Sequence, residues 1–238
     1  MENPRVRNHV RGGANSLDNG LVRRDEFEAS SNGRTADFGS AYEGSNPSAS
    51  ATAHERAPGS AKELVPIARP PYVLLVAIGG ATAKDLHEAA VGVLHVFGLA
   101  CKAGPHVDTP KYAFNKDRGQ YHTSAILRKL SSLRPRDVEV PVVGIADVDL
   151  FVPDAPYVFG DTDRDAQAAL YSVLRLQHAD PERVKRRIQV EAVHAVGHLL
   201  GLSHCPDARC AMFLSRDSAD ADRKGPGLCA ACRTALGY

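Results

Sequence analysis

The pattern of apolar and polar positions changes near residue 62 and divides the chain into two parts. After this point, residues 72–78 form a continuous apolar run that ends at two glycines, as in a buried strand. Residues 82–97 place apolar side chains at helical spacing, begin with a Thr suited to an N-cap, and are followed by Gly98. A second strand over residues 99–102 would complete a β-α-β beginning.

The rest of the pattern predicts an α/β fold in which a long helix follows the sheet. Asp180 suits an N-cap and Pro181 a first helical position, so the last long helix begins there and runs to Leu200, before Gly201. We therefore predict one domain over residues 63–238, with a mixed sheet. Its middle elements are a helix over residues 120–133 and strands over residues 138–152 (broken at Pro141), 157–159 and 168–173.

Residues 1–62 have a different composition. They hold six of the seven Asn of the chain, eight Ser and seven Gly, but only six residues of the Leu, Ile, Val and Met types. No apolar period of a helix or strand is present, and such a segment buries too little apolar area to offset the entropy of ordering it. We predict a disordered leader, of which a flexible regulatory arm is the simplest interpretation.

A second hypothesis concerns the origin of this leader. Residues 43–48 can be back-translated into codons that contain the T-arm consensus of a transfer-RNA gene, and residues 36–41 into an anticodon arm. The two arms occur in the right order. We therefore hypothesise that the start codon is misassigned and that the residues up to about 55 are translated transfer-RNA gene, not authentic protein. The nucleotide sequence tests this hypothesis.

The composition narrows the classes of partner. The 238 residues are 43% hydrophobic and 24% charged, and 29 basic against 28 acidic side chains give a net charge of +1. This balance gives no electrostatic reason to expect nucleic acid or a membrane as partner. No apolar run is long enough for a transmembrane helix, and no apolar signal core follows the basic start. We predict a cytoplasmic protein.

The residues that indicate chemistry begin at the end of the predicted long helix. His194 and His198 are four residues apart, so on a helix they lie on one face about one turn from each other. Gly201 permits a tight reversal, and His204 follows three residues later. The run brings three imidazoles to one point, and three nitrogen ligands with an open fourth position are typical of a catalytic zinc site.

A cysteine cluster follows directly. In a cytoplasmic chain such clustering favours metal over disulfides, and four thiolates in two close pairs predict a closed tetrahedral zinc site with a structural role. A redox-active Cys229-x-x-Cys232 pair and plain buried thiols are the competing interpretations, and neither explains four cysteines together. Cys101 stands apart and is interpreted as a core thiol. The four clustered residues are Cys205, Cys210, Cys229 and Cys232.

These motifs resemble the archaemetzincins, a branch of the metzincin zinc metallopeptidases. The resemblance extends to segments 118–121, 147–150, 158–160 and 222–225. It implies a metzincin-like domain with two zinc ions, one catalytic and one that stabilises the C-terminal segment, and a peptide or protein as substrate or ligand. The implied residues are His194, His198 and His204 for the first zinc, Cys205, Cys210, Cys229 and Cys232 for the second, and Met212 as the methionine turn beneath the first.

One position departs from the family's signature. The family has Glu directly after the first histidine, whereas this chain has Ala195. In His-Glu-x-x-His zinc peptidases that Glu takes a proton from the zinc-bound water and passes it to the leaving amine. Losing a positioned general base lowers the rate by about 10²- to 10⁴-fold.

Two functions therefore stay open. In the first, the cleft binds a peptide or protein and cleaves it weakly or not at all, which Ala195 favours. In the second, the protein is an active zinc peptidase that uses another carboxylate. Glu191, three residues before His194, is the candidate, although a helical side chain there is expected to point toward the helix start. A natural loss of the base is favoured over an engineered one, because the leader resembles raw open reading frame.

Overall fold

The main sheet has five strands in the order β2-β1-β5-β8-β7, within a computed structural model that describes residues 69–237. The leader predicted over residues 1–62 and the transfer-RNA hypothesis lie outside the described residues. Neighbouring strands are parallel except at β7, which is antiparallel to β8 and forms one edge. The strands are β1 (Val73–Ile78), β2 (Cys101–Ala103), β5 (Val142–Ala146), β7 (Gly160–Asp163) and β8 (Ala168–Ser172).

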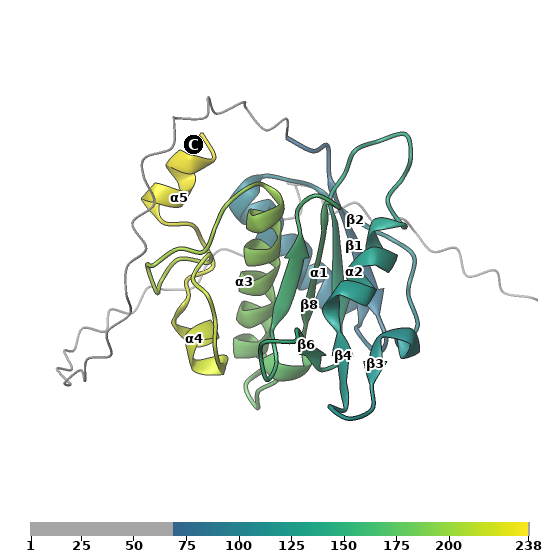
Figure 1. Ribbon diagram of the computed structural model, residues 1–238. Coiled ribbons are helices and arrows are strands. Elements are labelled where there is room, and N and C mark those ends of the chain that lie inside the picture. Colours follow the sequence, from purple (N-terminus) through teal and green to yellow (C-terminus); the bar gives the residue numbers. More distant parts are fainter. Residues whose placement is uncertain (1–68, 238) are drawn as a thin grey trace, which may run out of the picture.

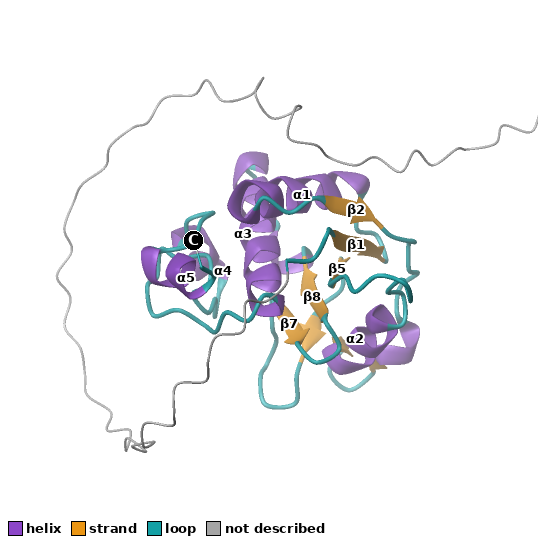
Figure 2. Ribbon diagram, turned by 90° about the horizontal axis from the view of Figure 1, so that it is seen from above, coloured by secondary structure: helices purple, strands orange, loops and turns teal. Residues whose placement is uncertain are grey.

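The central strands are apolar on both faces because helices cover both faces of the sheet. In β1, Val73 and Leu75 pack against one group of helices, and Leu74, Val76 and Ile78 pack on the opposite side. This is why β1 has a continuous apolar run and no alternation. Figures 1 and 2 show α1 (Ala83–Phe97) and α3 (Pro181–Leu199) on one face and α2 (Thr123–Ser131) on the other.

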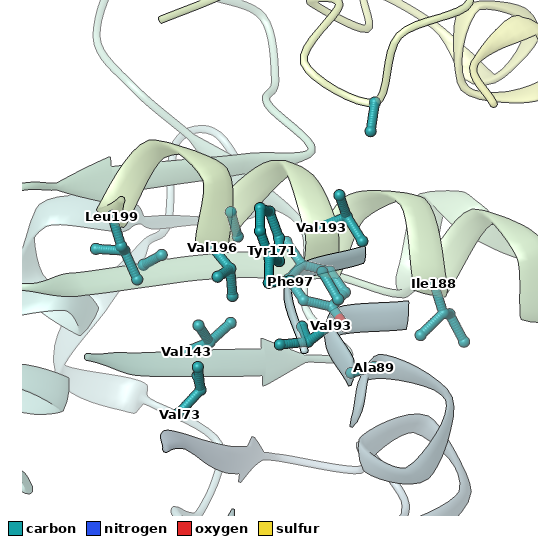
Figure 3. Packing of buried hydrophobic residues seen from close by; sticks show 14 of the residues in the cluster. Val73, Ala89, Val93, Phe97, Val143, Tyr171, Ile188, Val193, Val196 and Leu199 are labelled. Carbon is teal, nitrogen blue, oxygen red and sulfur yellow. The ribbon is translucent and has the colours of Figure 1, made fainter. Parts of the chain in front are cut away.

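The larger core lies between the sheet and the pair α1 and α3. Figure 3 shows Val93 of α1 near Val193 and Val196 of α3, with Val143 of β5 on the sheet side. The predicted cap of α1 is present: the side chain of Thr82 accepts a hydrogen bond from the Asp85 amide, and Gly98 ends the helix in the left-handed conformation. These contacts fix the position of α3, the helix that carries the predicted ligands.

The structure corrects three of the predicted elements. The helix predicted over residues 120–133 begins only at Thr123, because residues 120–122 are a strand in a second, small sheet of order β3-β4-β6. The region 138–152 holds two short strands, and residues 157–159 make only an isolated bridge between Val158 and Leu150. β7 was not predicted, since its sequence Gly-Asp-Thr-Asp is polar. The small-sheet strands are β3 (Phe114–Asn115), β4 (Gln120–His122) and β6 (Leu150–Phe151).

The C-terminal segment packs outside α3 in the form of two short helices, α4 (Ser218–Arg223) and α5 (Ala230–Ala235). A partly buried ion pair holds α4 against α3, with Arg187 Nε 2.7 Å from Asp222 Oδ1 and Nη2 2.8 Å from Oδ2. Single 3-10 turns occur at Lys111–Ala113 and Leu174–Leu176. Within residues 69–237, no helix is long and apolar enough to cross a membrane. The predicted mixed α/β fold with a long helix is confirmed.

Candidate metal centre

α3 and the turn after it position the three histidines. Asp180 caps the helix by accepting a hydrogen bond from the Glu182 amide at 3.0 Å, and Pro181 occupies the first turn, as predicted. After Leu199 the chain reverses at Gly201, whose φ of 96° is a conformation that favours glycine. The reversal is closed by a hydrogen bond of 2.9 Å from the Leu202 amide to the Gly197 carbonyl. It brings His204 back to the face that carries the other two histidines.

The three imidazoles converge on one point. Nε2 of His194 lies 3.1 Å from Nε2 of His198, and a ligand nitrogen from each of the three rings fits within 4.8 Å of the others. Nδ1 of His194 donates to the Ala211 carbonyl and Nδ1 of His198 to the Leu202 carbonyl, both at 2.8 Å. Because a carbonyl only accepts, each Nδ1 carries the proton and each Nε2 presents its lone pair.

This donor set fits zinc. Zn–N bonds of about 2.0–2.1 Å in a tetrahedral site separate two ligand nitrogens by roughly 3.3–3.4 Å, close to the spacing of the His194 and His198 nitrogens. The surroundings also keep the rings in the neutral form that binds metal. Burial lowers the pKa of His194 to about 3 and that of His198 to about 4, and it lowers the pKa of His204. The Lys224 ammonium adds to the lowering at all three rings.

The four cysteines form a second cluster, and all are free thiols. Sγ of Cys205 lies 3.7 Å from Sγ of Cys229, and Sγ of Cys210 lies 3.8 Å from Sγ of Cys232. A tetrahedral zinc with Zn–S bonds of about 2.3 Å separates its sulfurs by roughly 3.8 Å. The cluster therefore has the dimensions of a closed Zn–Cys₄ site. A hydrogen bond from the backbone amide of Cys232 lowers the pKa of Cys229 to about 7.

One short segment connects the two clusters. Cys205 follows His204 directly, and its amide donates to the Met212 carbonyl at 2.9 Å. Met212 is fully buried beneath α3, at a point where a Cβ on Gly197 would lie 2.4 Å from its sulfur. Gly197 is therefore needed for this close approach. The neighbouring Ala211 carbonyl orients His194, so the loop that carries Cys210 also holds a histidine of the other cluster.

A cavity of about 590 Å³ opens beside the histidines, within the usual range for ligand sites. All three histidines and Ala195 line it, together with the edge strand β7 and the segment around Ser215 and Arg216. Two lining residues are joined directly, because the Tyr157 hydroxyl donates to the Arg216 carbonyl at 2.8 Å. The histidine cluster therefore faces a cavity that is large enough for part of a peptide.

Comparison with known proteins identifies the family. A family model described as "Peptidase family M54" matches residues 86–237, which is more than half of the chain. The chain belongs to peptidase family M54. The archaemetzincin of Methanocaldococcus jannaschii is 36% identical over 143 residues, which cover 58% of this chain and 76% of that protein. The resemblance to the archaemetzincins drawn from the sequence is thus confirmed.

Solved structures of M54 relatives share the fold of this chain. The crystal structure of archaemetzincin from Methanopyrus kandleri superposes with a TM-score of 0.63 at 30% identity, covering 72% of this chain and 97% of the other. A structure described as a zinc-dependent peptidase from Methanocorpusculum labreanum gives a TM-score of 0.63 at 25% identity, covering 69% and 99%. Both cover most of residues 69–237, so the fold of this M54 member is that of archaemetzincins.

Glu191, the substitute base considered from the sequence, is held in a buried ion pair in this M54 chain. Nζ of Lys224 lies 2.9 Å from Oε1 of Glu191, and the side chains of both residues are almost completely buried, at 0% and 4% exposure. The hydroxyl of Ser215 lies 3.3 Å from the same oxygen. Burial alone would raise the pKa of Glu191, but Lys224, His194 and these hydrogen bonds outweigh it and lower the pKa. Glu191 lines the cavity as a carboxylate with a fixed partner.

The sequence did not predict several residues that surround the metal centre. Lys224 lies in a segment that resembled the family, yet its burial beneath α3 had no sequence signal, because an exposed lysine is the default expectation. Arg164 follows the unpredicted strand β7, and its guanidinium donates to the Leu202 carbonyl beside His198. A polar strand at a sheet edge gives little apolar pattern to detect, so this side of the site could not be predicted from periodicity.

Proposed function

We propose that this protein is a zinc-binding M54 member whose cleft binds peptides and hydrolyses them weakly or not at all. The observation that carries the proposal is the combination of three convergent imidazoles on the cavity with a methyl group at position 195. His194, His198 and His204 would hold the catalytic-type zinc, which when bound polarises a peptide carbonyl and lowers the pKa of water. The Ala195 side chain can neither accept nor return a proton.

The cavity wall supports an extended peptide as the ligand. Among residues 69–237, β7 is an edge strand that pairs only with β8, and Gly160, Asp161 and Thr162 of this strand line the cavity. An edge strand offers unpaired backbone groups to which an extended chain adds as a further strand. A peptide bound along β7 would therefore cross in front of the three histidines.

The remaining parts of the proposal follow from composition and the cysteine cluster. A second zinc on Cys205, Cys210, Cys229 and Cys232 would be structural, because four protein ligands leave no position for a substrate. A net charge of +1 supports a peptide or protein as partner rather than nucleic acid or a membrane. The free thiols support a location in the cytoplasm.

The alternative base, Glu191, is disfavoured by its contacts. Lys224 and Ser215 both engage Oε1, and the ion pair holds the carboxylate one helical turn before His194. Taking up a proton there would leave the Lys224 ammonium buried without a charged partner, which is costly. If Glu191 were the base, Glu191→Gln would abolish the residual hydrolysis; we expect that rate to stay within about threefold of wild type once folding is matched.

A matched pair of variants tests the proposal. Wild type and Ala195→Glu, both loaded with zinc and verified by metal analysis, are assayed on one broad peptide library. We expect Ala195→Glu to cleave about 10²- to 10⁴-fold faster, because it regains a proton acceptor next to His194. Ala195→Gln fills the same volume without a base and is the control. Cleavage by wild type at the rate of Ala195→Glu would contradict the proposal.

A further inference from the structure

The cavity reaches the side chain of Ala195. Glu191 and Ala195 are one helical turn apart on the same face of α3, and both line the cavity. In His-Glu-x-x-His peptidases this position carries Glu. Ala and Glu side chains differ by one methylene and one carboxylate, which together are the heavy atoms of acetate. The cavity therefore reaches the side chain at the position where a glutamate would place the heavy atoms of a small carboxylate, beside His194.

The charges around this space favour an anion. Arg216 is exposed on the cavity wall, and its guanidinium has no ion pair or hydrogen bond to any residue from 69 to 237. Arg164, on another wall, donates to the neutral Leu202 carbonyl. Two carboxylates also line the cavity, but Glu191 is neutralised by Lys224, which leaves only Asp161 to balance two arginines. The cavity is thus net positive, and a bound zinc ion would increase this.

The backbone of Arg216 is held in the cavity wall by contacts of its neighbour and of its own carbonyl. Ser215 lies 3.3 Å from Glu191, one turn before Ala195 on the same helical face, and Arg216 follows Ser215 directly. The hydrogen bond from Tyr157 to the Arg216 carbonyl fixes the backbone at this point. Arg216, a cation without a partner among residues 69–237, and Ala195 therefore line the same cavity.

We propose that the space at Ala195 is a binding site for a carboxylate supplied by the ligand, and that this carboxylate replaces the missing general base. This inference rests on the proposed peptidase function and names its substrate class: peptides that bring an acidic side chain or a free C-terminal carboxylate to this position. Peptides without such a group bind in the cleft and are not cleaved. Ala195 then determines which peptides are cleaved. A glutamate at this position would supply the base for all peptides.

The chemistry balances without any further reactant. The ligand carboxylate accepts a proton from a water molecule as the water oxygen bonds to the peptide carbonyl carbon. It returns that proton to the amide nitrogen as the C–N bond breaks, which releases an amine and a carboxylic acid. The ligand carboxylate ends the cycle ionised, as it began.

Acetate binding tests the site independently of activity. Zinc-loaded wild type and Ala195→Glu are titrated with ¹³C-acetate and followed by NMR, with acetamide as the neutral isostere. We expect saturable acetate binding to wild type, at least tenfold weaker binding to Ala195→Glu, whose side chain fills the space, and no binding of acetamide. Equal acetate binding by both proteins would place acetate on the metal or elsewhere and overturn the inference.

Two arginine variants test the charge argument. Arg216→Gln removes the unpaired cation, and Arg136→Gln removes an exposed arginine outside the cavity lining as the matched control. We expect Arg216→Gln to weaken acetate binding by about two- to fivefold, the effect of one exposed charge pair, and Arg136→Gln to leave it unchanged. An equal effect of the two variants would contradict a specific role for Arg216.

Activity measurements then identify the source of the carboxylate. Acetate should accelerate hydrolysis by wild type, but not by Ala195→Glu, and peptide pairs that differ by Glu against Gln, or by a free against an amidated C-terminus, separate the two sources. If Ala195→Glu cleaves while acetate neither binds to wild type nor accelerates it, the inference fails and the proposed function stands. If acetate binds to wild type and no variant cleaves any peptide, the peptidase function fails and the carboxylate site stands.

Discussion

The cysteine cluster and the histidine cluster share the segment from His204 to Met212 but differ in how they are enclosed. Four sulfurs can fill the shell of a tetrahedral zinc, and Cys210 and Cys232 are buried in the core. Three imidazoles leave one position open, and that position faces a cavity of about 590 Å³. Four protein donors can enclose a zinc ion completely, as in sites that stabilise a fold. Three donors beside a cavity leave one position at which a ligand can be acted on.

The largest effect is expected from removing the closed site. Cys229→Ser with Cys232→Ser should lose one zinc per chain and destabilise residues 205–237, because structural zinc contributes on the order of 10 kcal/mol to folding. Metal analysis and hydrogen exchange across this segment measure the result. His198→Ala is the matched control from the open site and should lose the other zinc while the segment stays protected. If residues 205–237 were equally protected from hydrogen exchange in both variants, the two sites would not differ in how much they stabilise this segment.

A smaller effect is expected between the clusters, at the buried ion pair. Lys224→Met leaves the Glu191 carboxylate buried without a partner, and the free energy of unfolding should fall by about 3–5 kcal/mol in urea titrations. The double variant Lys224→Met with Glu191→Leu removes both charges and should recover most of this loss. No recovery in the double variant would mean that Lys224 acts through packing and not through charge.

Per pH unit, the smallest effect is the acid sensitivity of the metal-free protein. Because burial lowers the pKa of His194 to about 3 and of His198 to about 4, the unfolded chain binds protons near pH 6.5 that the folded chain does not. Stability is therefore full above pH 6.5 and falls as the pH decreases toward 4, by at most about 1.4 kcal/mol per pH unit for each imidazole. Glu191, whose pKa is lowered, loses its contribution only below about pH 4.5.

Chemical denaturation at several pH values measures this dependence. His198→Ala should have a shallower dependence than wild type, since it retains one of the two strongly shifted imidazoles. A flat profile between pH 6.5 and 4 in the wild-type protein would show that the histidines are not buried in the neutral form. That outcome would also weaken the contrast between the two clusters, because the histidines would then be as accessible to water as residues on the protein surface.

The elements that could be predicted are strands that are buried on both faces and helices that begin at a recognisable N-cap residue. β1 is apolar throughout and β8 is buried throughout because helices cover both faces, and α1 and α3 begin at caps that the sequence encodes in Thr82 and Asp180. Residues 120–122 were misassigned to a helix because their extended form depends on pairing with the short strand β3 just before them and with β6, which lies far along the chain. β7 was missed because its polar residues acquire strand geometry only by pairing with β8.

The candidate site divides in the same way. The spacing of His194, His198 and His204 on a helix and its glycine turn placed the three imidazoles together, since a helix fixes the geometry of residues four apart. The spacing of the cysteines predicted their clustering. Neither motif contained information on Lys224, which meets Glu191 across 33 residues, or on the wall that β7 and Arg216 add to the cavity.

Residue identity at short spacing was enough to indicate the family, the two clusters of candidate metal ligands and Ala195 directly after the first histidine. Only the tertiary structure decided what surrounds them. It bound Glu191 to a buried lysine, left the Arg216 guanidinium unpaired among the described residues, and opened a cavity where a carboxylate would otherwise lie. Such contacts arise from packing between distant segments, so they set what this site can bind.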